Sequence, residues 1–319
     1  MLYGDLVLDR FVLGTPKRIS REAPVIILSY EGQRDLPGGG ANALANIAAL
    51  GGAAVPVGVV GDDEPGRALL TALAEFGIDT SSIAILPDVH TITKVRILAG
   101  GPTSLRHQVA RYDIEDRFAD STQATRALFQ RLDEVATTAD AAAISDYGYG
   151  VVSAAGVARL RARLKPGAFA VMDSRFALTT LGQVDGATPN LEELAAATGE
   201  PLASDADVAQ AAEALRQRLN AHFLLATRGS RGMTLALGDG GVSHIPVYGA
   251  EEVADVTGAG DTVIATLTLA LAAGATPLQA ATIANLAGGI VVMKLGTATV
   301  SRDELHRAID LAPFTDDRP

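Results

Sequence analysis

The sequence contains no cysteine and no tryptophan, and aromatic residues make up only 4% of it. The lack of cysteine excludes disulfides, zinc sites built from thiolates and cysteine nucleophiles. The five histidines do not follow the spacing of a metal-binding pair, so we do not expect them to hold a metal. Thr, Gly and Lys interrupt the longest apolar runs, which therefore fall short of the roughly 20 residues that span a bilayer.

Positive charge is also scarce: the chain has 26 basic and 37 acidic residues, which gives a net charge of −11. This balance argues against a general nucleic-acid or anionic-membrane surface. A small anionic substrate is still compatible with it, since a binding site needs only a few local cations. The N-terminus lacks the charged-then-apolar pattern of a secretion signal. We therefore expect a cytoplasmic protein with a small-molecule substrate and with neither nucleic acid nor membrane as a partner.

Hydrophobic residues make up 48% of the chain, mainly Ala, Leu, Val and Ile, which suits helices packed on a sheet. From about residue 130, continuous apolar strands alternate with helical segments, a pattern typical of parallel β-α-β units. Residues 232–247 differ, because two short strands flank a glycine-rich turn and indicate an antiparallel hairpin. We expect an α/β fold with a mostly parallel sheet and treat residues 1–319 as a single domain.

Polar side chains follow four of the expected strands, where each strand ends. They are Asp146, Asp173, Asn190 and Thr227. Ligands of open α/β sheets bind outside the carboxyl ends of the strands, so these four side chains are expected to line one crevice. Helix N-capping explains any one of them equally well, but it is less convincing for all four.

Two segments, about 11–35 and 88–113, interrupt the α/β alternation with the period-two patterning of β-strands. Within the second, the segments "TKVRIL" and "HQVARYDI" are expected to pair across a glycine-rich turn. Two such insertions predict a small sheet over the crevice. A sheet in that position would act as a lid that excludes water.

The stretch "DVTGAGDT" precedes a long apolar helix that is expected to be buried. A helix start leaves N–H groups unpaired and carries partial positive charge, so Gly258, Ala259 and Gly260 would offer an anion site. Asp261 lies at the same helix start and could accept a proton from an attacking hydroxyl. An ordinary glycine-rich turn with an acid at the helix start is the alternative, and the buried helix favours a functional site.

Two further motifs allow both a functional and a structural interpretation. Asn190 and Glu193 share one face of a first helical turn and could hold hydrated magnesium and phosphate oxygens. The same pair could instead form a capping box, which is the better local explanation. In "PGGGANALAN", Gly38–Gly40 permit close backbone approach, and Asn42 and Asn46 could bind sugar hydroxyls. There is no P-loop and no G-x-G-x-x-G after the first strand.

With these motifs in place, nearly the whole chain resembles the ribokinase-type (PfkB) carbohydrate kinases. The motifs that carry the resemblance are "DVTGAGDT", "PGGGANALANIAALGG" and "TPNLEE". Within that family the chain is most similar to the D-glycero-D-manno-heptose 7-phosphate kinases, through "GDLVLDRF", "RISREAPV", "TITKVRIL", "ISDYGYG" and "KLGTATVS". The resemblance implies a three-layer sandwich with a β-sheet lid, ATP and Mg²⁺ as cofactors, K⁺ in some members, and a homodimer formed through the lid.

The resemblance also implies roles for individual residues. Asp261 would be the catalytic base, and the N–H groups of Gly258, Ala259 and Gly260 would form the anion hole. Glu193 would hold Mg²⁺ through water, and backbone carbonyls around Asp255 and Thr257 would supply a K⁺ site. The nucleotide would lie along Asn190, Glu193, Thr227, Gly229, Gly232, Asn285, Lys294 and Gly296. The sugar or sugar phosphate would meet Asp9, Gly38, Gly39, Asn42, Lys94, Arg96 and Arg111, together with the strand-end residue Asp146.

The chain departs from the heptose kinases at three places near the expected sugar side. Tyr149 stands where they usually have a lysine, Arg175 ends an Asp-Ser-Arg segment in place of their "DPK", and the segment 99–113 is longer. These departures leave other acceptors open, namely fructose, fructose phosphate, ribose or a nucleoside. A non-catalytic nucleotide-binding module is the alternative outside the enzymes.

Overall fold

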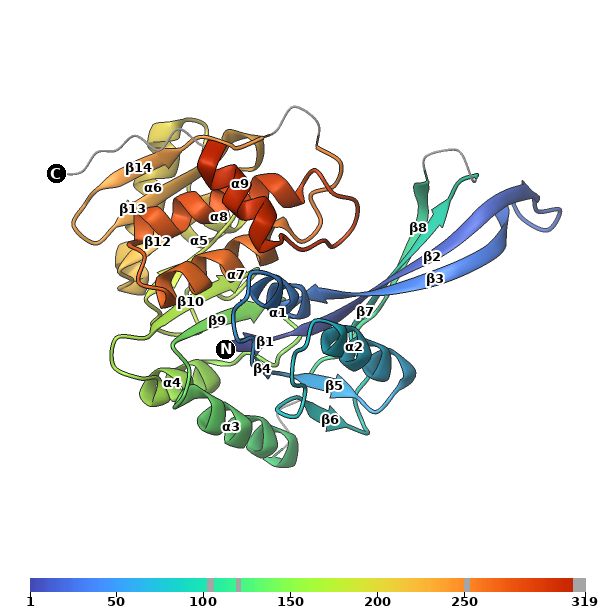
Figure 1. Cartoon of the computed structure of the whole chain (residues 1–319), viewed down its shortest axis with the longest axis horizontal. Coiled ribbons are helices and arrows are strands. Elements are labelled where there is room, and N and C mark those ends of the chain that lie inside the picture. Colours follow the sequence, from blue (N-terminus) through green and yellow to red (C-terminus); the bar gives the residue numbers. More distant parts are fainter. Residues whose placement is uncertain (102–105, 119–121, 250–252, 312–319) are drawn as a thin grey trace.

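The computed structural model describes residues 1–101, 106–118, 122–249 and 253–311. It consists of an α/β body and a long, narrow β-sheet that projects from one side of it (Figure 1). The body is built on an eight-stranded sheet with the strand order β14-β13-β12-β11-β10-β9-β1-β4. Its strands are β1 (Leu2–Gly4), β4 (Pro56–Val57), β9 (Ala141–Asp146), β10 (Phe169–Ser174), β11 (Gly186–Ala187), β12 (Phe223–Thr227), β13 (Met233–Leu237) and β14 (Val242–Ile245).

The central sheet is parallel from β4 to β12, and the pairings of β12 with β13 and of β13 with β14 are antiparallel. The predicted mostly parallel sheet and the hairpin at 232–247 are therefore confirmed. Successive side chains of a strand point to opposite faces, and here both faces are covered. In β9, Ala143 packs into one core cluster and Ile144 into the other, which explains the continuous apolar runs in the sequence.

Helices cover the two faces of the sheet and give the expected three layers (Figure 1). One face is covered by α3 (Thr122–Ala136), α4 (Ala154–Arg163), α5 (Leu191–Thr198) and α6 (Asp205–Leu219). The other is covered by α1 (Gly40–Ala49), α2 (Glu64–Glu75), α7 (Ala259–Ala272) and α8 (Pro277–Val291). Helix α9 (Arg302–Leu311) packs on the end of α8, and a short 3-10 turn, η1, spans Gly229–Arg231.

The projecting sheet contains both segments that interrupt the α/β alternation. Its strands, in spatial order, are β3 (Ile26–Gly39), β2 (Leu6–Ile19), β7 (Thr93–Ala99) and β8 (His107–Ile114). The pairing of β7 with β8 is antiparallel, as predicted, and most of the turn between them lies outside the described residues. A separate pair of short parallel strands, β5 (Val59–Gly61) and β6 (Ala84–Leu86), lies beside the base of this sheet.

The strands β2 and β3 extend further toward the body than the predicted boundaries of 11 and 35. Leu6 pairs with Gly39 at the inner end of the ribbon, and α1 follows directly. The inner end of the projecting sheet is therefore continuous with the central core. In the described ranges, no helix is both long and apolar enough to cross a membrane.

Candidate active site

A polar pocket of about 380 Å³ lies where the carboxyl ends of β9, β10 and β12 meet the start of α7 and the base of the projecting sheet. The four strand-end residues Asp146, Asp173, Asn190 and Thr227 all line it, as the topology predicted. The remaining lining residues are Asp9, Gly39, Lys94, Arg96, Arg111, Tyr147, Arg175, Thr188, Glu193, Val256, Thr257, Gly258, Gly260, Asp261 and Thr297.

Asp261 lies in the first turn of α7 and lines this pocket, although only 2% of its surface is exposed. Its carboxylate accepts one hydrogen bond from Asn42 Nδ2 at 3.1 Å and another from the Tyr147 hydroxyl at 2.7 Å. Burial raises the pKa of Asp261 to about 6, against the opposing effect of these two hydrogen bonds. Asp261 is therefore a fixed carboxylate with a pKa close to neutral, as a general base requires.

The start of α7 presents backbone N–H groups beside this carboxylate. Helix α7 begins at Ala259, just before the start expected at about Gly260 or Asp261, and Gly258 is its N-cap. The Ala259 N–H donates a long hydrogen bond to the Val256 carbonyl at 3.3 Å, whereas the N–H groups of Gly258, Gly260 and Asp261 have no acceptor among the described residues. Of the three predicted anion-hole residues, Ala259 is therefore the least suited to bind an anion through its N–H group. The N–H group of Asp261, which was not predicted, is a further candidate.

Gly258 adopts a backbone conformation that only glycine takes easily, with φ of +79°. A Cβ atom at this position would lie 2.4 Å from Asn42 Nδ2, the group that donates to Asp261. Asn42 is buried and does not line the pocket, so its contact supports a role in orienting Asp261. The predicted sugar contact of Asn42 stays a prediction. The Asn46 amide donates to the Ala298 carbonyl and accepts from the Val300 N–H.

Tyr147 is a functional candidate that the sequence interpretation did not include. Its hydroxyl donates to Asp261, and its ring lies against Lys94 and Arg175. The loop that carries it is held by the buried Asp5, whose carboxylate accepts N–H bonds from Tyr147, Tyr149 and Val151. In the sequence, Asp5 lies in "GD" and Tyr147 in "SDY", each at the end of an expected strand. Only the pairing of β1 with β9 in the structure shows that these two strand ends lie side by side.

The projecting sheet supplies the side of the pocket that the sequence assigned to the sugar. Asp9 is buried and forms an ion pair with Arg96 at 2.5 Å. A Cβ atom at Gly38 would lie 2.6 Å from the Asp9 carboxylate, so the glycine makes room for it. Gly39 lines the pocket, and Arg111 forms an ion pair with Asp113 on the same strand.

The opposite side of the pocket contains three of the residues assigned to the nucleotide. Asn190 and Glu193 form a reciprocal capping box at the start of α5, as the structural alternative predicted. Both residues also line the pocket, so the predicted contact with nucleotide and magnesium remains compatible with the capping box. Thr227 lies beside Asn190 through an isolated parallel bridge. Asp173 adjoins them, and burial together with the Glu193 carboxylate raises its pKa well above the usual range.

Five residues assigned to the nucleotide, and Asp255, do not line this pocket. They are Gly229, Gly232, Asn285, Lys294, Gly296 and Asp255. The Lys294 ammonium pairs with Glu304 of α9, and the Asn285 amide donates to the Pro246 carbonyl. The Asp255 carboxylate accepts from the N–H and hydroxyl of Thr257 and from the Gly296 N–H. The Asp255 contacts close the turn directly before α7. The assignments to nucleotide and K⁺ stay predictions.

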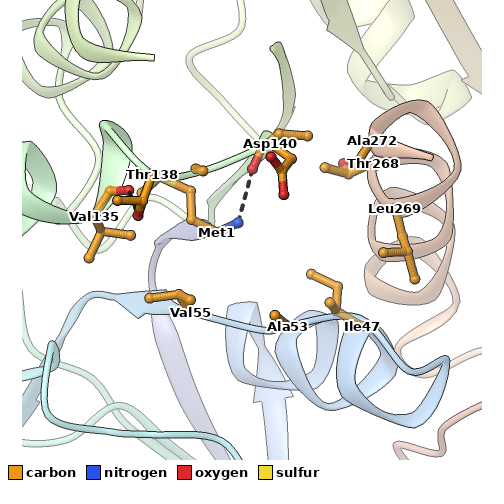
Figure 2. A pocket seen from close by; sticks show the side chains of 12 residues that line it. Met1, Ile47, Ala53, Val55, Val135, Thr138, Asp140, Thr268, Leu269 and Ala272 are labelled. Atoms are coloured by element: carbon orange, nitrogen blue, oxygen red, sulfur yellow. Dashed lines mark hydrogen bonds between the residues drawn. The ribbon is translucent and has the colours of Figure 1, made fainter. Parts of the chain in front are cut away.

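A second cavity, of about 160 Å³, lies at the amino ends of β1 and β9, at the opposite edge of the sheet from the polar pocket (Figure 2). The Met1 amine donates to the Ala141 carbonyl there, and apolar side chains of α1 and α7 form much of its wall. It contains no combination of acid, base and free N–H groups comparable to that around Asp261.

The hydrogen bond between Tyr147 and Asp261 leads to a prediction about pH. A carboxylate base must be ionised, so we expect kcat/KM to fall as the pH drops through about 6. Tyr147→Phe removes a donor that lowers the pKa of Asp261, and we expect the acidic limb to move upward by about one pH unit. Steady-state rates between pH 5 and 8.5 would measure this. An unchanged limb in the variant would contradict control of Asp261 by Tyr147.

Comparison with known proteins places this architecture in one family. The model of the pfkB family carbohydrate kinase matches residues 17–304. The bifunctional protein HldE of Caulobacter sp. (strain K31) is 43% identical to this chain, and HldE of Azorhizobium caulinodans is 41% identical to it. Each match covers 96% of this chain. The chain spans only 61% and 63% of the length of these two relatives.

Solved structures agree on the fold. Phosphofructokinase-2 from Escherichia coli, in complex with potassium, superposes with a TM-score of 0.79 at 20% identity, and 97% of each chain is covered. Ribokinase from Arabidopsis thaliana, complexed with ribose and ATP, gives 0.73 at 18% identity over 98% of each chain. The family match, the relatives and the shared fold lead to one conclusion: this chain belongs to the pfkB family of carbohydrate kinases, enzymes that phosphorylate sugars.

Proposed function

We propose that this chain is a single kinase domain that transfers the γ-phosphoryl group of ATP to a hydroxyl of a sugar phosphate in the cytoplasm. One observation carries the proposal: a buried carboxylate, Asp261, adjoins N–H groups without acceptors at the start of α7, inside a polar pocket. A base and an anion site side by side are what an in-line phosphoryl transfer requires.

In the proposed reaction, the sugar hydroxyl oxygen bonds to the γ-phosphorus and its proton passes to the Asp261 carboxylate. The bond between the γ-phosphorus and the bridging oxygen breaks, and ADP leaves. The N–H groups of Gly258, Gly260 and Asp261 stabilise the charge that grows on the phosphoryl oxygens. Asn42 and Tyr147 hold the carboxylate in place during the transfer.

The residues around Asp173 and Glu193 fit a magnesium ion. Both carboxylates line the pocket, and the Glu193 carboxylate disfavours ionisation of Asp173, a repulsion that a divalent cation would relieve. Magnesium binds through one or two carboxylates while keeping several waters, so three clustered acids are unnecessary, and none such occurs among the described residues. When bound, Mg²⁺ neutralises charge on the transferring phosphoryl group.

A potassium site near Asp255 and Thr257 is a further part of the proposal. The two residues form a tight turn, closed by the hydrogen bonds from Thr257 to the Asp255 carboxylate, directly before α7. Backbone carbonyls of this turn would be the ligands. A phosphofructokinase-2 of the same fold, from Escherichia coli, is described in complex with potassium. Turnover in potassium buffer compared with tetramethylammonium buffer measures the requirement.

The acceptor that we propose is D-glycero-D-manno-heptose 7-phosphate, phosphorylated to the 1,7-bisphosphate. The support is the similarity of five sequence motifs to the heptose kinases, together with cationic side chains on the sugar side of the pocket. Tyr149 and Arg175 depart from that pattern, and they are the reason to test related sugars as well.

A panel of acceptors tests this proposal. Purified protein with ATP and Mg²⁺ would be given heptose 7-phosphate, fructose 6-phosphate, fructose, ribose and a nucleoside, with ADP release as the readout. We expect the highest kcat/KM for heptose 7-phosphate. Binding of ATP without transfer to any acceptor would instead favour a non-catalytic nucleotide-binding module.

We also propose a homodimer formed through the projecting sheet. Exposed apolar side chains on its strands support this, since Ile19 is 71%, Tyr30 69% and Tyr112 54% exposed. Light scattering should give twice the mass of one chain, and Ile19→Asp should lower it to a single chain. A wild-type mass of one chain would contradict the dimer.

A further inference from the structure

Two buried asparagines of α1, Asn42 and Asn46, lie one helical turn apart on the same face of the helix. The exposed fraction of the residue is 2% for Asn42 and 0% for Asn46. Both were expected to bind sugar hydroxyls, but neither is among the residues that line the polar pocket. Their amides must therefore find hydrogen-bond partners within the protein itself.

The partners of Asn46 fix the direction in which its amide points. Its Oδ1 accepts from the Val300 N–H at 3.1 Å, and a backbone N–H can only donate. The Nδ2 group must then face the other way. There it donates to the Asn42 carbonyl at 3.0 Å, to Asn42 Oδ1 at 3.2 Å and to the Ala298 carbonyl at 3.4 Å. A reversed Asn46 amide would place donor against donor on one side and acceptor against acceptor on the other.

The orientation of Asn46 determines that of Asn42. Because Asn42 Oδ1 accepts from Asn46, the Nδ2 group of Asn42 is directed toward the start of α7. It donates there to the Asp261 carboxylate at 3.1 Å and to the Gly258 carbonyl at 3.4 Å. A reversed Asn42 amide would place its oxygen against an Asp261 carboxylate oxygen, a repulsive contact between two acceptors. The direction of the Asn42 amide therefore decides whether Asp261 receives a hydrogen bond or a repulsion.

We infer that Asn46 is a positioning residue for the transfer reaction, because it locks the Asn42 amide in the orientation that donates to Asp261. The inference rests on the proposed function, in which Asp261 is the base. The series of hydrogen bonds starts at Val300, in the segment before α9, and crosses two side chains of α1. Val300, Asn46 and Asn42 do not line the pocket, so their effect on the reaction passes through Asp261.

Two substitutions of Asn46 and one control test this role. Asn46→Ala removes the amide, and Asn46→Leu removes it while filling a similar volume. Ile47→Ala is the matched control, because Ile47 is the next residue of α1 and is buried in a hydrophobic cluster. All three variants should melt about 2 °C or more below the wild type, since Asn46 leaves the Val300 N–H without its acceptor and Ile47→Ala leaves a cavity. Stability alone therefore does not separate Asn46 from the control.

The acidic limb of the pH–rate profile does separate them. Without Asn46 the Asn42 amide is free to turn, so its donation to Asp261 weakens and the pKa of Asp261 rises above its value of about 6. We expect the limb of kcat/KM to move upward by about half to one pH unit, which lowers kcat/KM about twofold to fivefold at pH 6 and less than about twofold at pH 8.5. The limb of Ile47→Ala should match that of the wild type. These variants leave unchanged the other charged or titratable groups near Asp261, which are Tyr147, Asp9, Lys94 and Asp173.

A double-mutant cycle tests whether Asn46 acts through Asn42. Asn42→Ala should move the acidic limb in the same direction, and adding Asn46→Ala to it should move the limb no further. Tyr147→Phe removes the other donor to Asp261, so its shift should add to that of Asn46→Ala. An unshifted limb in Asn46→Ala, or shifts of the two asparagine variants that add, would overturn the inference. A KM for the sugar raised at every pH, with the limb unmoved, would assign Asn46 to sugar binding instead.

Carbon-13 NMR of the Asp261 carboxyl, identified by its loss in Asp261→Asn, provides a readout that needs no turnover. The pKa of Asp261 should be about half to one unit higher in Asn46→Ala than in the wild type, and equal values would overturn the inference. If the wild type phosphorylates no acceptor, the proposed function fails while this titration still decides the role of Asn46. If neither Asn46 variant folds, the side-chain N–H signals of Asn42 in the wild type decide it. They should shift with the same midpoint as the Asp261 carboxyl, and signals that do not titrate would overturn the inference.

Discussion

Asp261→Asn is expected to lower kcat by about 10²–10⁴ while leaving the affinity for ATP close to that of the wild type. The amide keeps the size of the side chain but cannot take up a proton. One of the two acceptor oxygens becomes an NH₂ donor, which the Tyr147 hydroxyl can accept once its own O–H has rotated away, while the remaining oxygen still accepts from Asn42. The variant should also fold normally. The pKa of Asp261 is raised to about 6, so the ionised carboxylate costs stability above that pH, and a neutral side chain removes the cost.

Two measurements make this result specific. Titration with ATP should give the same dissociation constant for both proteins, and thermal unfolding at pH 7.5 should give a melting temperature no lower than that of the wild type. A turnover number within about threefold of the wild type would contradict general-base catalysis by Asp261. A lowered melting temperature together with lost ATP binding would point to a structural role instead.

Gly258→Ala is expected to impair both stability and turnover. The positive φ of Gly258 costs an L-residue about 1–2 kcal/mol. The new methyl group would also meet the Asn42 amide at 2.4 Å and displace a hydrogen bond to Asp261. We expect a melting temperature lower by about 2 °C or more and kcat lower by about tenfold or more.

Gly260→Ala is the comparison that isolates this effect. A Cβ atom at Gly260 would meet only the Asp173 carboxylate, at an ordinary 3.8 Å, and the residue has no positive φ. The alanine keeps the N–H group that the proposed anion site uses. Gly260→Ala should therefore lose much less stability and turnover than Gly258→Ala. Equal losses in the two variants would show that the geometry of Gly258 has no special importance.

Much of the site could be predicted from local patterns, because the rules that apply there are local. Continuous apolar strands separated by helices indicated a parallel sheet, and a parallel sheet brings strand ends such as Asp146 and Thr227 to one edge. The glycine-rich turn before an apolar helix similarly indicated free N–H groups next to Asp261. Both features depend on residues that are close in the chain.

The features that were missed depend on contacts between distant segments. The hydrogen bond from Tyr147 to Asp261 joins residues 114 positions apart, and no spacing rule relates them. The same limit applies to charge pairing. Arg96, Arg111 and Lys94 were equivalent as sequence, and only the structure shows that Arg96 pairs with Asp9 and Arg111 with Asp113. Arg175 was noted as a departure, and the structure places its guanidinium against the ring of Tyr147.

The position of a bound acceptor tests the account most directly. A crystal structure with heptose 7-phosphate and a non-hydrolysable ATP analogue would measure the distance from the Asp261 carboxylate to the nearest sugar hydroxyl. The account predicts hydrogen-bond contact, about 2.6–3.2 Å, with the hydroxyl facing the γ-phosphate at the start of α7. A sugar hydroxyl directed away from Asp261, with another group poised to take its proton, would contradict it.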